Sequence, residues 1–289
     1  MGMATRRMLL VCLALAALGV TSGCATSFLY DRADRLANRW AGGYLELEPG
    51  QQALLDQRLA ELHLWHRREQ LPVYADWLRH AAARLENGAP LSRADMRDLG
   101  ADLGVLWREL GGAAVPLLAE LGAHLADEQV DGLLETLRAE HDKQLQAAAR
   151  RPDGWHQQRR ARSMERFLRR WTGSLTAGQR ASLHQWAADL EPSHAASFEN
   201  RAGWIEALAS ALEQRADTEL LVAAAETLFV TPTSRWSPEY EALVERNAAK
   251  TTAFLVDFLN GLEDRQRQRA IARLDALAEQ FEQLSRVGA

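Results

Sequence analysis

Apolar residues recur every three or four positions along most of this 289-residue chain. Leu99, Leu103, Leu106 and Leu110 form the clearest series. This spacing places the apolar side chains on one face of an α-helix. Ala, Leu, Arg, Glu and Gln, which are good helix formers, dominate the chain, and no segment alternates convincingly as a half-buried strand does. We therefore predict an all-α fold with about eight to ten helices.

Several helix boundaries are predicted from cap and turn chemistry. Ser92, followed three residues later by Asp95, is typical of a capping box. Ser237 suits an N-cap, because Pro238 then occupies the first helical position. Pro72 lies inside a long periodic run, so we expect a kink in the helix there. No Gly/Ser linker interrupts the chain, which indicates that its parts pack together.

Four predicted helix starts share one outline: a Leu, three residues, a Gln and then an apolar helical run. They are Leu47 with Gln51, Leu125 with Gln129, Leu175 with Gln179, and Leu262 with Gln266. In the third, the Thr176 hydroxyl can accept the N–H of Gln179, and the Gln179 side chain can reach back to the N–H of Thr176. Glu48, Ala126 and Glu263 stand at the equivalent positions and are weaker caps than Thr. The motif is thus first a way to begin a helix.

The spacing of these starts suggests an internal repeat. Leu47 and Leu175 are 128 residues apart, and Leu125 and Leu262 are 137 apart. A longer match, WLRHAAARLEN with WIEALASALEQ, begins at Trp77 and again 127 residues later. We infer a duplication of about 130 residues that yields two related antiparallel helical halves. The alternative is a chance match between Ala/Leu-rich helices.

The N-terminus has the pattern of a secretory signal. Two arginines precede Met8–Val20, an apolar segment of 13 residues that is shorter than the roughly 20 needed to span a bilayer. The TSGC sequence that ends at Cys24 resembles a bacterial lipobox, although Thr21 stands where Leu is usual. The resemblance implies cleavage before Cys24 and lipidation of its sulfur. Ordinary signal cleavage beside an incidental Cys is the alternative. Ala25 fits the sorting pattern for the outer membrane, with the body facing the periplasm.

The predicted organisation follows from these signals. It comprises a signal peptide (1–23), a lipidated N-terminus with a first helix (24–46), a first helical half (47–149), an Arg-rich connecting segment (150–172) and a second helical half (173–289). The chain has only two Cys, of which Cys12 would leave with the signal, so we expect no disulfide in the body. The net charge of −5 argues against a nucleic-acid partner.

Two family resemblances accompany these motifs. LTAGQ (175–179) resembles the LTxxQ motif of the Spy/CpxP group of helical periplasmic proteins, and the other three starts keep only its Leu and Gln. That resemblance implies an ATP-independent chaperone or envelope-stress module that forms a thin curved cradle. The segments at 22–40, 47–78 and 170–187 resemble an uncharacterised family of proteobacterial lipoproteins, a domain of unknown function, across nearly the whole mature chain. This second resemblance implies no established activity.

The most unusual local composition is the Arg-rich segment, where only Asp153 and Glu165 oppose eight arginines between Arg150 and Arg170. The candidate binding residues are Arg159, Arg160, Arg162, Arg166, Arg169 and Arg170. They could bind anionic lipid headgroups, acidic partner segments or unfolded clients. Alternatively, they form ion pairs with neighbouring acidic helices.

Other candidate chemistry is weak. His63, His66 and Glu69 follow at three-residue steps, but Arg67 is adjacent to His66 and no second cluster completes a metal site, so we expect no metal and no cofactor. Nucleophile elbows, phosphate-binding Gly loops and zinc-protease helices are absent from the sequence, so we predict that the protein is not an enzyme. A cell-wall hydrolase would need acid and base residues clustered in a pocket. Most of the nine Trp are expected in the core, and a minority could line a groove for a peptide or glycan.

We therefore expect a lipoprotein tethered to the outer membrane through Cys24, facing the periplasm, that acts as a Spy-like chaperone or envelope-stress module on unfolded or envelope proteins. The alternative is an interaction or scaffold lipoprotein with one specific protein partner.

Overall fold

The computed structural model describes Tyr30, residues 38–39 and residues 41–286. Within these ranges the chain is helical and contains no strand, which confirms the predicted all-α class. Helix after helix carries apolar side chains on one side, as the three- and four-residue spacing of the sequence requires. None of the described helices combines the length and apolar character needed to cross a membrane.

The helices follow one another through short loops. In chain order they are α4 (Pro49–Trp65), the π-helix η1 (His66–Gln70), α5 (Leu71–Glu86), α6 (Arg93–Ala123), α7 (Asp127–Ala149), α8 (Trp155–Thr172), α9 (Ala177–Asp189), α10 (His194–Glu213), α11 (Thr218–Ala225), the π-helix η2 (Glu226–Val230), the 3₁₀-helix η3 (Pro232–Arg235), α12 (Pro238–Asn260) and α13 (Asp264–Arg286).

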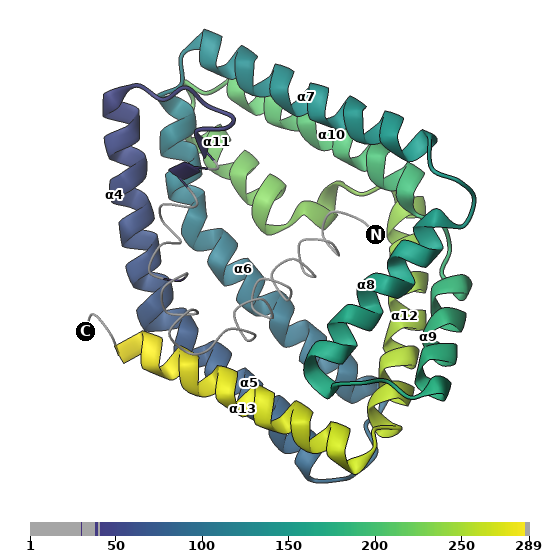
Figure 1. Cartoon of the computed structure of the whole chain (residues 1–289). Helices are drawn as coiled ribbons and strands as arrows, with labels where there is room; N and C mark the ends of the chain where they lie inside the picture. The colour runs from purple at the N-terminus through teal and green to yellow at the C-terminus, as the bar shows by residue number, and fades with distance from the viewer. Residues whose placement is uncertain (1–29, 31–37, 40, 287–289) are drawn as a thin grey trace.

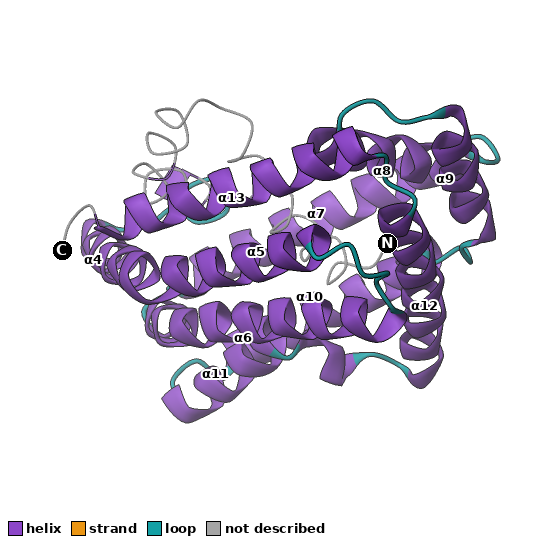
Figure 2. Cartoon of the chain, turned by 90° about the horizontal axis from the view of Figure 1, so that it is seen from below, coloured by secondary structure: helices purple, strands orange, loops and turns teal. Residues whose placement is uncertain are grey.

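The helices form a four-sided frame (Figure 1). One side is α4, the next is the pair α5 and α13, the third contains α8, α9 and α12, and the fourth is the pair α7 and α10. The long helix α6 runs across the frame. Seen from below, α13, α5, α6 and α11 lie in that order as a stack (Figure 2), and each neighbouring pair is in contact.

Two sides of the frame join the two halves of the sequence. α5 from the first half packs antiparallel to α13 from the second, and α7 from the first half packs on α10 from the second. The long helix α6 of the first half also packs on α11 and α12 of the second, whereas α4 contacts α6 and α9 contacts α12 within a half. The halves are therefore interlocked in space, and neither is a separate body.

The helix caps predicted at Ser92 and Ser237 are found in the structure. The Ser92 hydroxyl accepts the N–H of Asp95, and the Asp95 carboxylate accepts the N–H of Ser92. Ser237 caps α12, with Pro238 as its first residue. Near Pro72, where a kink is expected, the chain passes from the π-helix η1 directly into α5. α4, η1 and α5 follow one another without a break, so Pro72 lies inside a continuous helical run, directly after the π-helical turn.

The apolar core is distributed around the frame in clusters. The largest side chains buried between α5 and α13 are Leu71, Tyr74 and Phe281, and Tyr30 packs among them. Other clusters lie between α8, α9 and α12, between α7 and α10, and between α4 and α6. Each side of the frame is thus stabilised by the apolar contacts of its own pair or triplet of helices.

Candidate functional site

The Leu–Gln helix starts meet in pairs inside the fold. The side-chain amides of Gln51 and Gln129 donate hydrogen bonds to each other's oxygens at 2.9 and 2.7 Å. Those of Gln179 and Gln266 do the same at 2.8 and 2.9 Å. The first start is therefore joined to the second, and the third to the fourth.

Each of these Gln side chains also holds the backbone at two points. The Gln129 oxygen accepts the N–H of Ala126 at 2.9 Å, and its nitrogen donates to the carbonyl of Glu46, which directly precedes Leu47. In the same way, Gln266 accepts the N–H of Glu263 and donates to the carbonyl of Ser174, which directly precedes Leu175. The Gln residues thus fasten one helix start to another.

The remaining residues of the motif are also internal. Leu125, Leu175 and Leu262 are buried, and Leu47 packs against two of the apolar clusters. Thr176 caps α9 as predicted, with its hydroxyl accepting the N–H of Gln179 at 3.1 Å. These side chains stabilise the frame, and Gln179 also borders a cleft between α9 and α12.

The arginines of the connecting segment lie on α8, and most of them share one face. At about 100° per residue, Arg159, Arg162, Arg166, Arg169 and Arg170 fall within an arc of about 100°. The buried side chains of α8 lie on the opposite side, and they are Ala161, Met164, Leu168 and Thr172. Arg160 projects away from the arginine face. Its guanidinium is partly desolvated, which lowers its pKa, and it donates to the carbonyls of Ala187 and Leu190 at 3.4 Å.

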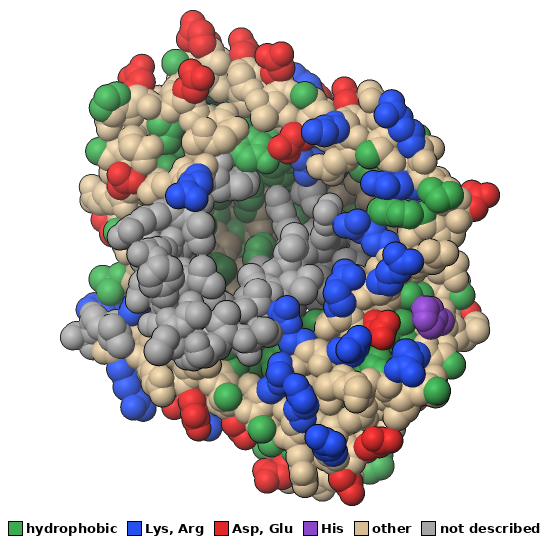
Figure 3. All heavy atoms as spheres, viewed as in Figure 1, with side chains coloured by type: hydrophobic (Ala, Val, Ile, Leu, Met, Phe, Trp, Pro, Cys, Tyr) green, Lys and Arg blue, Asp and Glu red, His purple; other side chains and the backbone are tan. Residues whose placement is uncertain are grey.

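The neighbouring helix α13 extends this basic face. Arg265, Arg269 and Arg273 follow at four-residue steps, and α13 contacts α8. The Arg269 side chain passes over Gly173, the residue with φ +88° that ends α8, where a Cβ would lie 3.3 Å from the Arg269 Cδ. In the space-filling view, Lys and Arg side chains gather over α8 and the adjoining part of α13 (Figure 3).

We name this the α8/α13 arginine surface. It consists of Arg162, Arg166, Arg169 and Arg170 on α8 and Arg265, Arg269 and Arg273 on α13. In the described part of the chain, none of the seven guanidiniums takes part in an ion pair or a hydrogen bond. The α13 members were not predicted from the sequence, although residues 265–273 contain four arginines and no acidic residue. Their four-residue spacing is the signal that could have revealed them.

Like charges crowd each other where the two helices meet. One terminal nitrogen of Arg170 is buried and has no hydrogen-bond partner. Burial lowers the pKa of Arg273, and the nearby guanidiniums of Arg269 and Arg170 lower it further. Such an arrangement favours an anion with several acceptor oxygens, because charge-assisted hydrogen bonds would satisfy the unpaired donors.

The histidines considered for a metal site have other roles. The Tyr30 hydroxyl and Nδ1 of His66 are 2.8 Å apart and hydrogen-bonded, while the rings of Tyr30 and His63 have centroids 4.6 Å apart. Burial, with a smaller contribution from His63, lowers the pKa of His66 to about 4. Glu69 is exposed. Across residues 41–286 no group of three or more His, Cys, Asp or Glu side chains could hold a metal ion.

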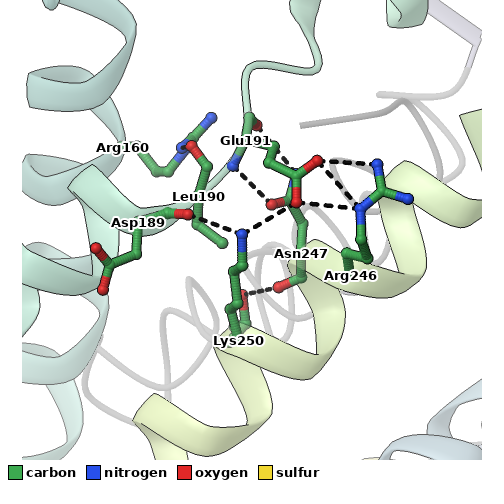
Figure 4. Close-up of polar contacts among 8 residues, drawn as sticks. Arg160, Asp189, Leu190, Glu191, Arg246, Asn247 and Lys250 are labelled. Carbon is green, nitrogen blue, oxygen red and sulfur yellow. Dashed lines mark hydrogen bonds and ion pairs between the residues drawn. The ribbon is translucent and has the colours of Figure 1, made fainter.

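A polar cluster fastens the corner between α9 and α10 to α12 (Figure 4). The Glu191 carboxylate accepts hydrogen bonds from Arg246 at 2.9 Å and from Lys250 at 3.0 Å. These two cations lower the pKa of Glu191 to about 2. Asn247 exchanges hydrogen bonds with the Glu191 backbone. The cluster satisfies the backbone at a helix end and is a structural feature of the frame.

Two clefts flank α12, and both contain aromatic residues. The first has a volume of ≈560 Å³ and lies between α10, η3 and the beginning of α12, where Trp204, Trp236 and Tyr240 line it. Burial raises the pKa of Tyr240, and its hydroxyl is enclosed without a hydrogen-bond partner. The second cleft, of ≈1050 Å³, is shallower, lies between α9 and the end of α12, and contains Trp186 and Phe254. Apolar side chains of a ligand would fit against these rings.

Cys24 and the predicted signal segment lie outside the described residues. No curated protein matches the chain, and no solved structure matches it. A model of a family of unknown function (DUF6279) matches residues 43–241, which contain every helix from α4 to α11 and the arginine face of α8. Because this match covers more than half of the chain, the protein belongs to that uncharacterised family.

Proposed function

We propose that this protein is a lipid-anchored, non-enzymatic protein of the periplasmic face of the outer membrane that holds apolar segments of unfolded or envelope proteins without ATP. The anchor in this proposal is the sulfur of Cys24, which follows the lipobox-like TSGC. The resemblance of LTAGQ to the motif of Spy-like chaperones points the same way. The two clefts along α12 are the observation that carries the proposal.

The chemistry of these clefts suits weak and unspecific binding. Trp204, Trp236 and Tyr240 offer ring faces and edges to apolar side chains, while Arg235 and Glu239 at the same cleft offer polar contacts to a peptide backbone. Lys250 and Asp257 line the second cleft beside Phe254. α12 has 23 residues, so an extended segment lying along it could reach both clefts over about 35 Å.

The test is suppression of client aggregation by the mature chain (24–289) carrying Cys24→Ser. We expect light scattering by an unfolding client to fall at near-equimolar protein without ATP. Trp236→Ser should weaken the effect several-fold. The matched control is Leu145→Ser on α7, whose side chain is 46% exposed and lies outside both clefts. No suppression by the parent protein, or an equal loss in both variants, would refute client holding at the clefts.

The second candidate is a scaffold with one specific protein partner, and the α8/α13 arginine surface favours it because a surface of one sign discriminates between partners. Crosslinking in cells separates the two functions: many crosslinked proteins favour client holding, and one dominant protein favours the scaffold. Mass spectrometry of the mature protein tests the anchor, which requires a thioether-linked lipid on Cys24.

A further inference from the structure

We propose that the α8/α13 arginine surface docks on the phosphate groups of anionic phospholipids and so orients the anchored protein on its membrane. This inference rests on the lipid anchor of the proposed function. It concerns a different surface from the clefts along α12, and it assigns the arginines one ligand, the headgroups of the bilayer in which the anchor sits.

Charge complementarity is the first argument. The protein carries a net charge of −5, yet seven guanidiniums collect on two neighbouring helices without an acidic partner in the described structure. Unpaired arginines of this kind repel one another, and Arg269 and Arg170 add to the effect of burial in lowering the pKa of Arg273. Phosphate oxygens would satisfy the buried nitrogen of Arg170 and reduce the repulsion, because a guanidinium pairs with phosphate through parallel hydrogen bonds.

Three acidic residues in the second half of α13 act on α5 and not on this surface. The Glu282 carboxylate accepts hydrogen bonds from Arg79 of α5 at 2.7 and 2.9 Å. Asp275 and Glu279 also act on Arg79, since their charges raise its pKa. α13 therefore turns these three carboxylates towards α5, and the arginines that adjoin α8 can approach a negatively charged bilayer.

The position of the anchor is the second argument. Tyr30 is buried against Leu71 of α5 and Phe281 of α13. Cys24 lies only six residues before Tyr30, and six extended residues reach about 20 Å. Phe281 and Arg273 are on the same helix, about 12 Å apart along its axis. A lipid on Cys24 therefore keeps the bilayer surface within reach of the arginines, at a high effective concentration.

The experiment uses the mature chain with Cys24→Ser, so that binding reports the surface alone. Cosedimentation is measured with phosphatidylcholine vesicles that contain phosphatidylglycerol and with phosphatidylcholine vesicles alone. We expect binding to the anionic vesicles only. Each arginine near the surface contributes about a fivefold change in partitioning, so Arg162→Gln/Arg166→Gln/Arg169→Gln should weaken binding on the order of a hundredfold.

The matched control is Arg93→Gln/Arg97→Gln/Arg108→Gln on α6. It removes the same charge from three exposed arginines that form no ion pair within the described part of the chain. Equal losses in the two triple variants would overturn the proposal, as would equal binding to both kinds of vesicle. Displacement from the vesicles by inorganic phosphate at matched ionic strength would also overturn it, because it would identify a site for the free anion. Circular dichroism melting curves establish that both variants fold.

The outcome is separable from the proposed function. The α8 triple variant should suppress client aggregation as well as the parent does, and Trp236→Ser should bind anionic vesicles as well as the parent does. Loss of vesicle binding with intact suppression therefore concerns the arginine surface alone. Absence of lipid on Cys24 would remove the anchor from both proposals.

Discussion

Gln51 and Gln129 exchange hydrogen bonds through their side-chain amides although 78 positions separate them in the chain. Each amide also satisfies the first backbone N–H of its own helix start. Gln179 and Gln266 repeat the arrangement at the opposite part of the frame. The pairs connect α4 to α7 and α9 to α13, which are not consecutive in the chain, and they give the repeated Leu–Gln outline a structural purpose.

We predict that the two amides of a pair stabilise the fold jointly. Gln51→Ala leaves the largely buried polar groups of Gln129 without their partner, so each single replacement should lower the free energy of unfolding by about 1–3 kcal/mol. The double replacement should cost less than the sum of the two by about 1 kcal/mol. Urea unfolding measures all three values. Gln185→Ala is the control, because the exposed Gln185 amide contacts only Asp189 four residues away. Strictly additive losses would contradict the pairing.

A second prediction exploits the equivalence of two helix starts. Ala126 has φ −72° and ψ 162°, and Thr176 has φ −71° and ψ 167°. A Thr at position 126 can therefore accept the N–H of Gln129 without strain, and Ala126→Thr should raise the free energy of unfolding by about 1 kcal/mol. Thr176→Ala should lower it by a similar amount.

The control for that gain is Ala139→Thr in the middle of α7, where Thr lowers helix stability by a few tenths of a kcal/mol to about 0.7 kcal/mol. The denaturation midpoints of Ala126→Thr, Thr176→Ala and Ala139→Thr measure these changes in stability. If Ala126→Thr and Ala139→Thr destabilise the protein alike, the two starts are not equivalent in energy.

A third prediction follows from the pKa of Glu191, which is about 2 in the folded chain against an ordinary value of 4.5. Because the folded pKa is the lower one, the stabilisation is complete above about pH 4.5 and is lost as the pH falls towards 2. Glu191→Gln should lower the unfolding midpoint at neutral pH and flatten its dependence on pH in that acidic window. The comparison is Glu245→Gln on α12, an exposed position without a described ion pair. An unchanged slope in Glu191→Gln would contradict the role of the cluster.

A fourth prediction concerns His66, whose pKa of about 4 lies below the ordinary value of 6.5. As the pH falls from about 6.5 to about 4, the unfolded chain takes up a proton at this position before the folded chain does, so stability decreases. Resonances of the His66 ring should titrate near pH 4 in nitrogen-detected NMR spectra. His66→Phe should remove this part of the acid sensitivity. Titration near pH 6.5 would mean that the imidazole beside Tyr30 is hydrated.

The fifth prediction concerns the contact between α5 and α13. Phe281 is 1% exposed and packs with Tyr74, so Phe281→Ala should lower the free energy of unfolding by about 3–5 kcal/mol. Leu145→Ala on the exposed face of α7 should change it by less than about 0.5 kcal/mol. Equal midpoints for the two variants would show that this side of the frame does not carry the stability of the fold.

The sequence predicts those features that depend on neighbouring residues. The helical class follows from the three- and four-residue spacing, and the Thr176 cap follows from Gln179 three residues later, because both are local. The arginine face of α8 is also visible, since the five residues lie within three turns. Such signals depend on local backbone geometry, so they do not change with the packing of distant parts of the chain.

The long-range pairings were not predictable in the same way. The spacing matched the Gln51 start with the Gln179 start as repeats, whereas the contacts join Gln51 to Gln129. A match between two helix starts in the sequence does not reveal which of the four starts are in contact in the folded chain. The duplication itself stays a hypothesis, to which the matching geometry of the two Gln pairs adds support. Arg269 and Arg273 join the basic surface only because α13 packs beside α8, which no local pattern reveals.

The closure of the frame by α13 has a consequence for biosynthesis. Arg79 and Glu282, which pair across α5 and α13, are 203 positions apart, so the last helix to emerge completes a side begun near the start of the chain. Contacts of such separation form slowly. Until they form, Leu71, Tyr74 and Leu78 of α5 are open to water and to other nascent chains. A stop codon that removes only the final two dozen residues should therefore yield an aggregating product, because α5 then lacks the helix that covers its apolar face.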